Sequence, residues 1–111
     1  MTIKISETRS DGHKITIFEG VVEIAHAYLY ILYNDLHDQP FGFLEDVFVL
    51  EAYRGKGYAK ELIKQIFTLA KERRCYKIVA TSRYKRKLVH RLYSKLGFTT
   101  VGKEFRIDLL I

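Results

Sequence analysis

A helix-forming segment between two strand-forming segments is the feature that most constrains how this chain can fold. Apolar residues recur at the spacing of one buried helical face: Ala59, Leu62, Ile63, Ile66, Phe67 and Ala70. The segments on either side, FLEDVFVL (43–50) and YKIVATS (76–82), have the apolar and β-branched composition of strands. This order predicts two parallel strands joined by a right-handed crossover through the helix.

The remaining segments predict a mixed sheet around this crossover. Strands are expected at residues 2–9, 13–18, 21–33, 98–102 and 104–111, with a turn at 10–12, and a second helix is expected at 87–96. Gly97 is placed to end that helix. We therefore expect one α/β (α+β) domain over residues 1–111, with two main helices and six to seven mostly antiparallel strands.

Charge is strongly segregated along the sequence. Residues 1–53 contain three Lys or Arg against nine Asp or Glu, whereas residues 54–95 contain fourteen against two. This asymmetry indicates an anionic ligand bound by the second half and a cationic one bound by the first. A solvated basic face is the alternative interpretation of the same pattern.

Several classes of protein are disfavoured by what the sequence lacks. No apolar run is long enough to cross a membrane, and no leader-like segment is recognised at the N-terminus. The single cysteine, Cys75, is compatible with a reducing compartment, so a cytoplasmic protein is expected. His13, His26 and His37 have no metal-ligand spacing, and we expect no metal site.

The stretch AYRGKGYAKEL (52–62) places two glycines and two cations where the first strand of the crossover meets the helix. The first N–H groups of a helix lack internal partners, and the helix dipole makes that end partially positive. Gly55 and Gly57 would let a phosphate approach these groups, with Arg54, Lys56 and Lys60 adding charge. A tight turn without a ligand is the competing interpretation.

The same stretch resembles a known family. RGKGYA (54–59) is similar to the R/Q-x-x-G-x-G/A signature of the GNAT superfamily of N-acetyltransferases, and RKLVHRLYSKLGF (86–98) resembles a later segment of that family. The resemblance implies a sheet in which the two parallel strands splay apart, and transfer of an acetyl group from acetyl-CoA to a primary amine. It implies as acceptor a small cationic, amino-sugar or aminoalkyl amine, or an exposed peptide amine, with direct attack in a ternary complex.

The resemblance also implies roles for particular residues. Those expected to bind the cofactor are Val47, Phe48, Val49, Arg54, Gly55, Lys56, Gly57, Tyr58, Ala59, Lys60 and Arg86. Tyr93 matches the tyrosine that protonates the departing thiolate. Glu45 is our candidate general base and shares a strand face with Phe43 and Val47, whereas Asp46 points the opposite way unless a bulge intervenes.

The family normally has two helices between its first two strands. Here only RSDGHK (9–14) joins the expected strands at 2–9 and 13–18, so the acceptor site is expected to be open or completed by a second subunit. A homodimer could form through EFRIDLLI (104–111) at a sheet edge.

Two alternative functions remain at this point. One is a CoA-binding regulatory or interaction subunit without catalysis. The other is a nucleic-acid-binding module that uses the basic stripe Arg83, Tyr84, Lys85, Arg86, Lys87 and Arg91. The second leaves the paired glycines unexplained, and nucleic acid is therefore the less favoured partner.

Overall fold

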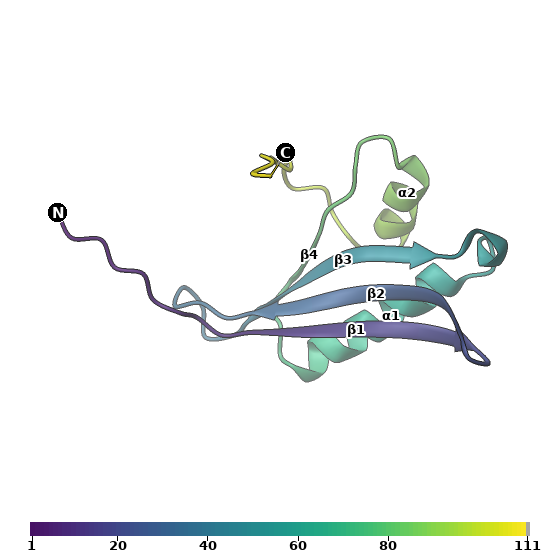
Figure 1. Ribbon diagram of the computed structural model, residues 1–111, viewed down its shortest axis with the longest axis horizontal. Helices are drawn as coiled ribbons and strands as arrows, with labels where there is room; N and C mark the ends of the chain where they lie inside the picture. Colours follow the sequence, from purple (N-terminus) through teal and green to yellow (C-terminus); the bar gives the residue numbers. More distant parts are fainter. Residues whose placement is uncertain (111) are drawn as a thin grey trace. The chain divides into compact units, whose positions relative to one another are not determined.

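The computed structural model describes residues 1–110 and divides the chain into two compact units, Met1–Ala80 and Thr81–Ile111. The first unit contains β1 (Ser10–Glu19), β2 (Val22–Leu32), β3 (Phe41–Val49), the 3-10 helix η1 (Glu51–Tyr53), α1 (Tyr58–Glu72) and β4 (Ile78–Ala80) (Figure 1). The second unit contains α2 (Lys87–Lys95). That residues 1–111 form one domain stays a prediction.

The sheet has the order β1-β2-β3-β4. β1 and β2 form an antiparallel hairpin, β2 and β3 are antiparallel, and β3 and β4 are parallel. α1 connects β3 to β4 and lies across one face of the sheet (Figure 1). The α+β class, the mixed sheet and the parallel pair joined through a helix are thus confirmed.

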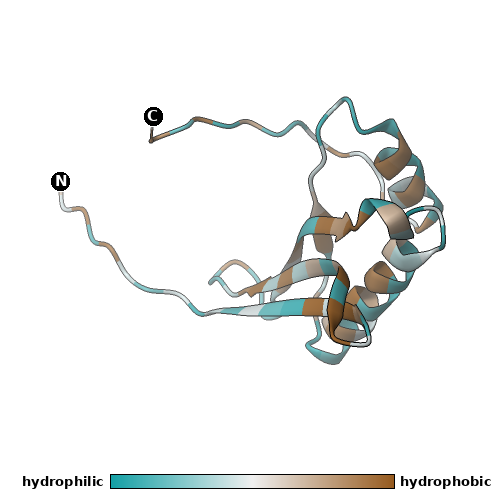
Figure 2. Ribbon diagram, turned by 45° about the vertical axis from the view of Figure 1, so that its right-hand side comes forward, coloured by the Kyte–Doolittle hydropathy of each residue, from teal (hydrophilic) through white to brown (hydrophobic). Residues whose placement is uncertain are grey.

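The core lies between α1 and the sheet. Alternate residues of β2, namely Ala25, Ala27, Leu29 and Ile31, are buried, and so is Leu44 of β3. α1 contributes Leu62, Ile63, Ile66 and Ala70, which recur at the predicted helical spacing. Figure 2 shows this alternation of residue types along the ribbon, with hydrophobic segments in brown and less hydrophobic ones paler or teal. Burial of this helical stripe fixes α1 on the sheet and therefore fixes where its N-terminus lies.

The expected first strand at 2–9 and the turn at 10–12 are wrong. Residues 1–9 form no strand, and the turn residues lie inside β1, where Asp11 pairs with Ile31 and Gly12 with Tyr30. Glycine was misleading because its role here is to make room: a Cβ on Gly12 would lie 3.3 Å from the Tyr30 ring. The open acceptor site was expected from a short connection between two strands at residues 9–14, but residues 10–14 lie within β1 and connect no two strands.

The expected strands at the C-terminal end are also not formed. Residues 98–110 contain no strand, while Ile111 falls outside the described residues. The apolar side chains that suggested a strand, among them Val101, Phe105 and Leu109, are each more than four-fifths exposed. Alternation alone does not make a strand where no partner strand is hydrogen-bonded to it. The described residues therefore form a four-stranded sheet in place of the predicted six to seven strands.

Truncating a buried core side chain should lower the free energy of unfolding much more than truncating an exposed one. Ile66 is fully buried between α1 and the sheet, so Ile66→Ala is expected to lower the free energy of unfolding by about 2–5 kcal/mol. Leu36→Ala is the control, because Leu36 is 83% exposed and should change stability by less than about 0.5 kcal/mol. Urea unfolding of both variants tests this, and equal losses would contradict the assignment of the core.

Candidate functional site

The glycine-containing turn between η1 and α1 adopts a backbone that suits glycine. Gly55 has φ 77° and Gly57 has φ 87°, both in the left-handed region that side chains disfavour. A Cβ built on either residue would meet nothing within 4 Å. These glycines are therefore required by backbone conformation, and the space beside them is open.

The N-terminus of α1 offers unpaired N–H groups at this turn. Gly57 is the N-cap, no side chain caps the helix, and the first helical bond runs from the Glu61 N–H to the Gly57 carbonyl at 3.1 Å. The N–H groups of Tyr58, Ala59 and Lys60 consequently have no partner within the helix. With the helix dipole, they form a site suited to an anion.

Cationic side chains surround the same turn. The Arg54 Nε donates to the Val49 carbonyl at 2.9 Å, and the guanidinium lies 5.7 Å from the centre of the Phe48 ring. The Lys56 ammonium lies 5.5 Å from the centre of the Tyr53 ring. Arg54 is thus tied to the end of β3, while Lys56 and Lys60 are exposed and can supply charge to an anion.

The parallel strands lose contact before β3 ends. β3 pairs with β4 only from Gly42 opposite Ile78 to Leu44 opposite Ala80, and β3 continues to Val49. The Leu50 N–H donates to the Ile24 carbonyl, so the backbone groups of Leu50 face β2. Because backbone groups alternate in direction along a strand, those of Phe48 also face β2, and those of Val47 and Val49 face away from it. Of these groups the Val49 carbonyl already accepts from Arg54. Within residues 1–110, no strand pairs with this part of β3 on its outer side.

A bulge re-aims the side chains of β3 at the same point. Tyr28 pairs with Glu45 and His26 with Phe48, so Asp46 and Val47 together lie opposite Ala27. Asp46 has φ 52°, a left-handed conformation that aspartate tolerates better than most residues. The bulge that would allow Asp46 to change face is therefore present. It puts Phe48, in place of the expected Val47, on the face that carries Glu45.

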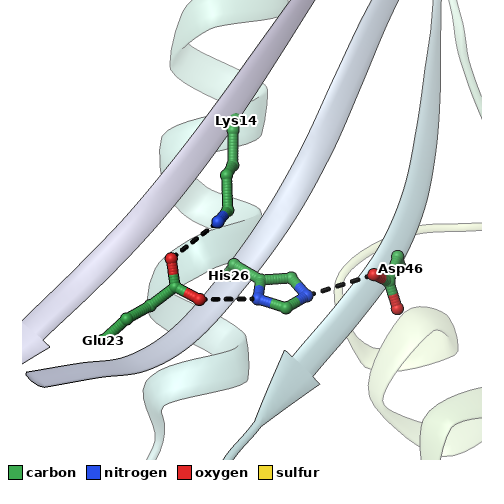
Figure 3. A network of polar contacts seen from close by, with 4 residues as sticks. All are labelled: Lys14, Glu23, His26 and Asp46. Carbon is green, nitrogen blue, oxygen red and sulfur yellow. Dashed lines mark hydrogen bonds and ion pairs between the residues drawn. The ribbon is translucent and has the colours of Figure 1, made fainter.

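Glu45 and Asp46 differ in how they are held. Glu45 is exposed, and its side chain has no hydrogen bond or ion pair with any described residue. Asp46 Oδ2 lies 3.1 Å from His26 Nε2, and His26 Nδ1 lies 3.3 Å from Glu23 Oε2. Glu23 in turn accepts from Lys14 at 2.6 Å, which completes a four-residue network (Figure 3).

The contact between Glu23 and His26 could not be predicted from the sequence, for a physical reason. Residues three apart in a regular strand face opposite sides, so Glu23 and His26 were not expected to meet. The register of β1 and β2 shifts between Ile17 and Phe18, which leaves one extra residue on β2 between the two side chains. Such a shift is seen only in the pairing of two strands, because the sequence of one strand does not determine its register.

The second unit carries the other two candidate residues. α2 begins after Arg86, which is its N-cap, and the predicted end is confirmed because Gly97 follows the helix with φ 101°. Tyr93 lies on α2, and its ring centre is 5.2 Å from that of Phe98. Burial raises the pKa of the Tyr93 hydroxyl, against the opposing influence of the Arg86 charge.

Two kinds of feature are absent from residues 1–110. No group of three or more His, Cys, Asp or Glu side chains is arranged to hold a metal ion. Over the same residues, no helix has both the length and the apolar character needed to span a membrane.

Residues 1–110 thus combine a mixed sheet, a parallel strand pair that separates, and a glycine-containing helix start beside that separation. The model of the acetyltransferase (GNAT) family matches residues 4–98, and the chain belongs to this family. The resemblance inferred from the sequence is confirmed.

Relatives with known names extend the comparison. The chain is 37% identical over 68 residues to a glucosamine 6-phosphate N-acetyltransferase of Trypanosoma brucei brucei, a match that covers 61% of this chain and 44% of the relative. It is 29% identical over 94 residues to an aminoglycoside N(6')-acetyltransferase type 1 of Acinetobacter haemolyticus, covering 85% of this chain and 61% of the relative. The chain thus spans about half the length of the curated relatives it matches.

A solved structure shows the same fold. AAC(6')-Iy in complex with the bisubstrate analogue CoA-S-monomethyl-acetylneamine superposes with a TM-score of 0.73 at 22% identity, covering 90% of this chain and 70% of that one. At this identity the likeness shows the fold alone.

The raised pKa of Tyr93 gives a prediction with a definite sign. Burial favours the neutral Tyr93 hydroxyl in the folded protein. The stability that depends on this neutral form is fully present below the unfolded-state pKa of about 10, and it is lost as the pH rises through the higher folded-state pKa. We expect Tyr93 to remain mostly protonated at pH 10. A titration of the tyrosine Cζ carbons by NMR, with Tyr93→Phe to assign the resonance, measures this. Half-ionisation of Tyr93 at or below pH 10 would contradict it.

Proposed function

We propose that the chain binds acetyl-CoA and transfers its acetyl group to a primary amine. The observation that carries the proposal is the conjunction of two features at the end of β3: an outer edge without a strand partner, and an uncapped helix N-terminus with two left-handed glycines. An extended amide-containing arm can hydrogen-bond to the edge, and a diphosphate can bind the helix start. Acetyl-CoA has both parts.

In this proposal each candidate residue has a chemical task. The backbone N–H groups of Tyr58 to Lys60 bind the pyrophosphate, helped by Arg54, Lys56 and the bare backbone of Gly55 and Gly57. Val47 and Val49 pair with the pantetheine arm, and Phe48 flanks it. Arg86 and Tyr93 enter by family resemblance alone, Arg86 as a cofactor contact and Tyr93 as the proton donor to sulfur.

The reaction requires one bond to form and one to break. The amine nitrogen attacks the thioester carbonyl carbon to form the C–N bond, and the C–S bond then breaks to release the thiolate of CoA. Glu45, exposed beside the bulge, takes the proton that the amine must lose, and Tyr93 protonates the thiolate. A backbone N–H at the bulge stabilises the charge that develops on the carbonyl oxygen.

The acceptor in this proposal is a cationic amine, of the amino-sugar or aminoalkyl type or an exposed peptide amine. The acidic side chains near the end of β3, Glu45 and Asp46, suit an ammonium group. Two curated relatives are named for glucosamine 6-phosphate and aminoglycoside acetylation, which makes amino sugars the first class to test.

The donor site is tested by a charge placed at the helix start. Acetyl-CoA should bind the wild-type chain, and Gly57→Glu should abolish binding because a carboxylate would occupy the anion site. Gly20→Glu is a matched control: Gly20 also has a positive φ and open space at its Cβ, but it lies in the turn between β1 and β2. Calorimetric titration measures all three proteins. No binding by the wild type at about 1 mM acetyl-CoA, the weak end of ordinary substrate affinities, would contradict the proposal.

Catalysis is tested separately from binding. With acetyl-CoA and a panel of amines, we expect release of free CoA thiol, and we expect Tyr93→Phe and Glu45→Gln each to lower kcat by about 100- to 10,000-fold while acetyl-CoA still binds. Binding without acetylation of any amine would favour the non-catalytic CoA-binding subunit.

A homodimer and a cytoplasmic location stay predictions. Light scattering at working concentration measures the oligomeric state.

A further inference from the structure

The bulge carboxylate Asp46 is anchored while its neighbour Glu45 is not. One oxygen of Asp46 contacts the His26 ring at 3.1 Å, and 62% of the Asp46 side chain remains exposed. His26 is only 18% exposed and is packed between rings, 5.6 Å from that of Tyr28 and 5.5 Å from that of Phe48. A half-buried ring thus holds an exposed carboxylate at a defined position.

The contacts of His26 fix the direction in which its ring faces. Both ring nitrogens face carboxylate oxygens, Glu23 on one side and Asp46 on the other (Figure 3). The Lys14 ammonium lowers the pKa of Glu23, so that carboxylate is ionised and only accepts hydrogen bonds. The contact of Nδ1 with Glu23, which is itself paired with Lys14, turns Nε2 of the same ring toward Asp46.

The position of Asp46 gives this anchoring a functional meaning. β3 separates from β4 after Leu44, and Asp46 lies two residues beyond, inside the bulge. Its left-handed φ is unfavourable for a residue with a side chain, and the contact with His26 offsets that cost. The same contact therefore fixes the carboxylate and the shape of the backbone beside the free edge.

We propose that Asp46 binds the ammonium of the acceptor together with Glu45, and that His26 is a positioning residue that acts through Asp46. This inference rests on the proposed function, in which the thioester lies along the free edge of β3. Glu45 then supplies a mobile carboxylate for the proton, and Asp46 supplies a fixed one for orientation. An amine held between them has its nitrogen next to the separation of the strands.

Kinetics of single and double variants test whether His26 acts through Asp46. With acetyl-CoA and either neamine or glucosamine 6-phosphate as probe, Asp46→Asn and His26→Ala are each expected to lower kcat/KM for the amine about tenfold. The affinity for acetyl-CoA should not change. The double variant should be no slower than Asp46→Asn, because His26 has no role once the carboxylate is gone. Multiplicative losses, or full activity of Asp46→Asn, would overturn the proposal.

Matched variants separate this effect from folding. Asparagine and glycine both tolerate a left-handed backbone, so Asp46→Asn and Asp46→Gly should keep the bulge and the Tm while losing amine turnover. Asp11→Asn and His37→Ala make the same chemical changes away from the bulge, on β1 and in the connection before β3, and should leave turnover unchanged. Equal losses in these controls would overturn the assignment.

A readout without any amine distinguishes the two possible failures. In a long-range ¹H–¹⁵N spectrum of the free protein, Asp46→Asn should shift the His26 Nε2 resonance and leave that of His37 in place. An unmoved His26 resonance overturns the contact and the proposal with it. A shifted resonance in a protein that does not bind acetyl-CoA would instead overturn the proposed function.

Discussion

Burial of one face of α1 against β2 and β3 is the interaction on which the rest of the molecule depends. Leu62, Ile63 and Ile66 are each fully buried and lie over a sheet face that includes Leu29 and Leu44. This contact holds the helix axis relative to β3 and so fixes where the helix begins. The proposed anion site depends on the start of α1, which no described side chain caps, being held next to the end of that strand.

The second determinant is the change of partners along β3. Its first half is hydrogen-bonded on both sides, to β2 and to β4, whereas its second half pairs, among residues 1–110, with β2 alone. The bulge at Asp46 occurs at that transition and turns two consecutive carboxylates toward the face that carries His26. In the proposed function, one strand thereby offers a backbone edge to the cofactor and a pair of acidic side chains to the amine.

How much could be predicted from the sequence depended on the range of the interactions involved. Both helices follow from local periodicity, and their ends from Gly57 and Gly97, so they were predicted within about two residues. The parallel pair followed from the order of elements. The glycine turn was recognised because its chemistry lies within six consecutive residues.

The errors arose where partners are distant in sequence. Gly12 resembled a turn, yet it lies within β1 and pairs with Tyr30 of β2. The apolar residues after Gly97 resembled strands but pair with none in the described part of the chain. The network around His26 depends on two register shifts, one on each side of β2, and a register is a property of two strands.

The hydrogen bond from Arg54 to the Val49 carbonyl also bears on solubility. An unpaired strand edge can template association with strands of other molecules, and proteins commonly protect such edges with charge and with bulges. Here Arg54 occupies the last outward carbonyl of β3, and the bulge interrupts the regular spacing that a long foreign strand would need. The edge left between them is short. It can accept a brief extended ligand while resisting the continuous pairing that leads to aggregation.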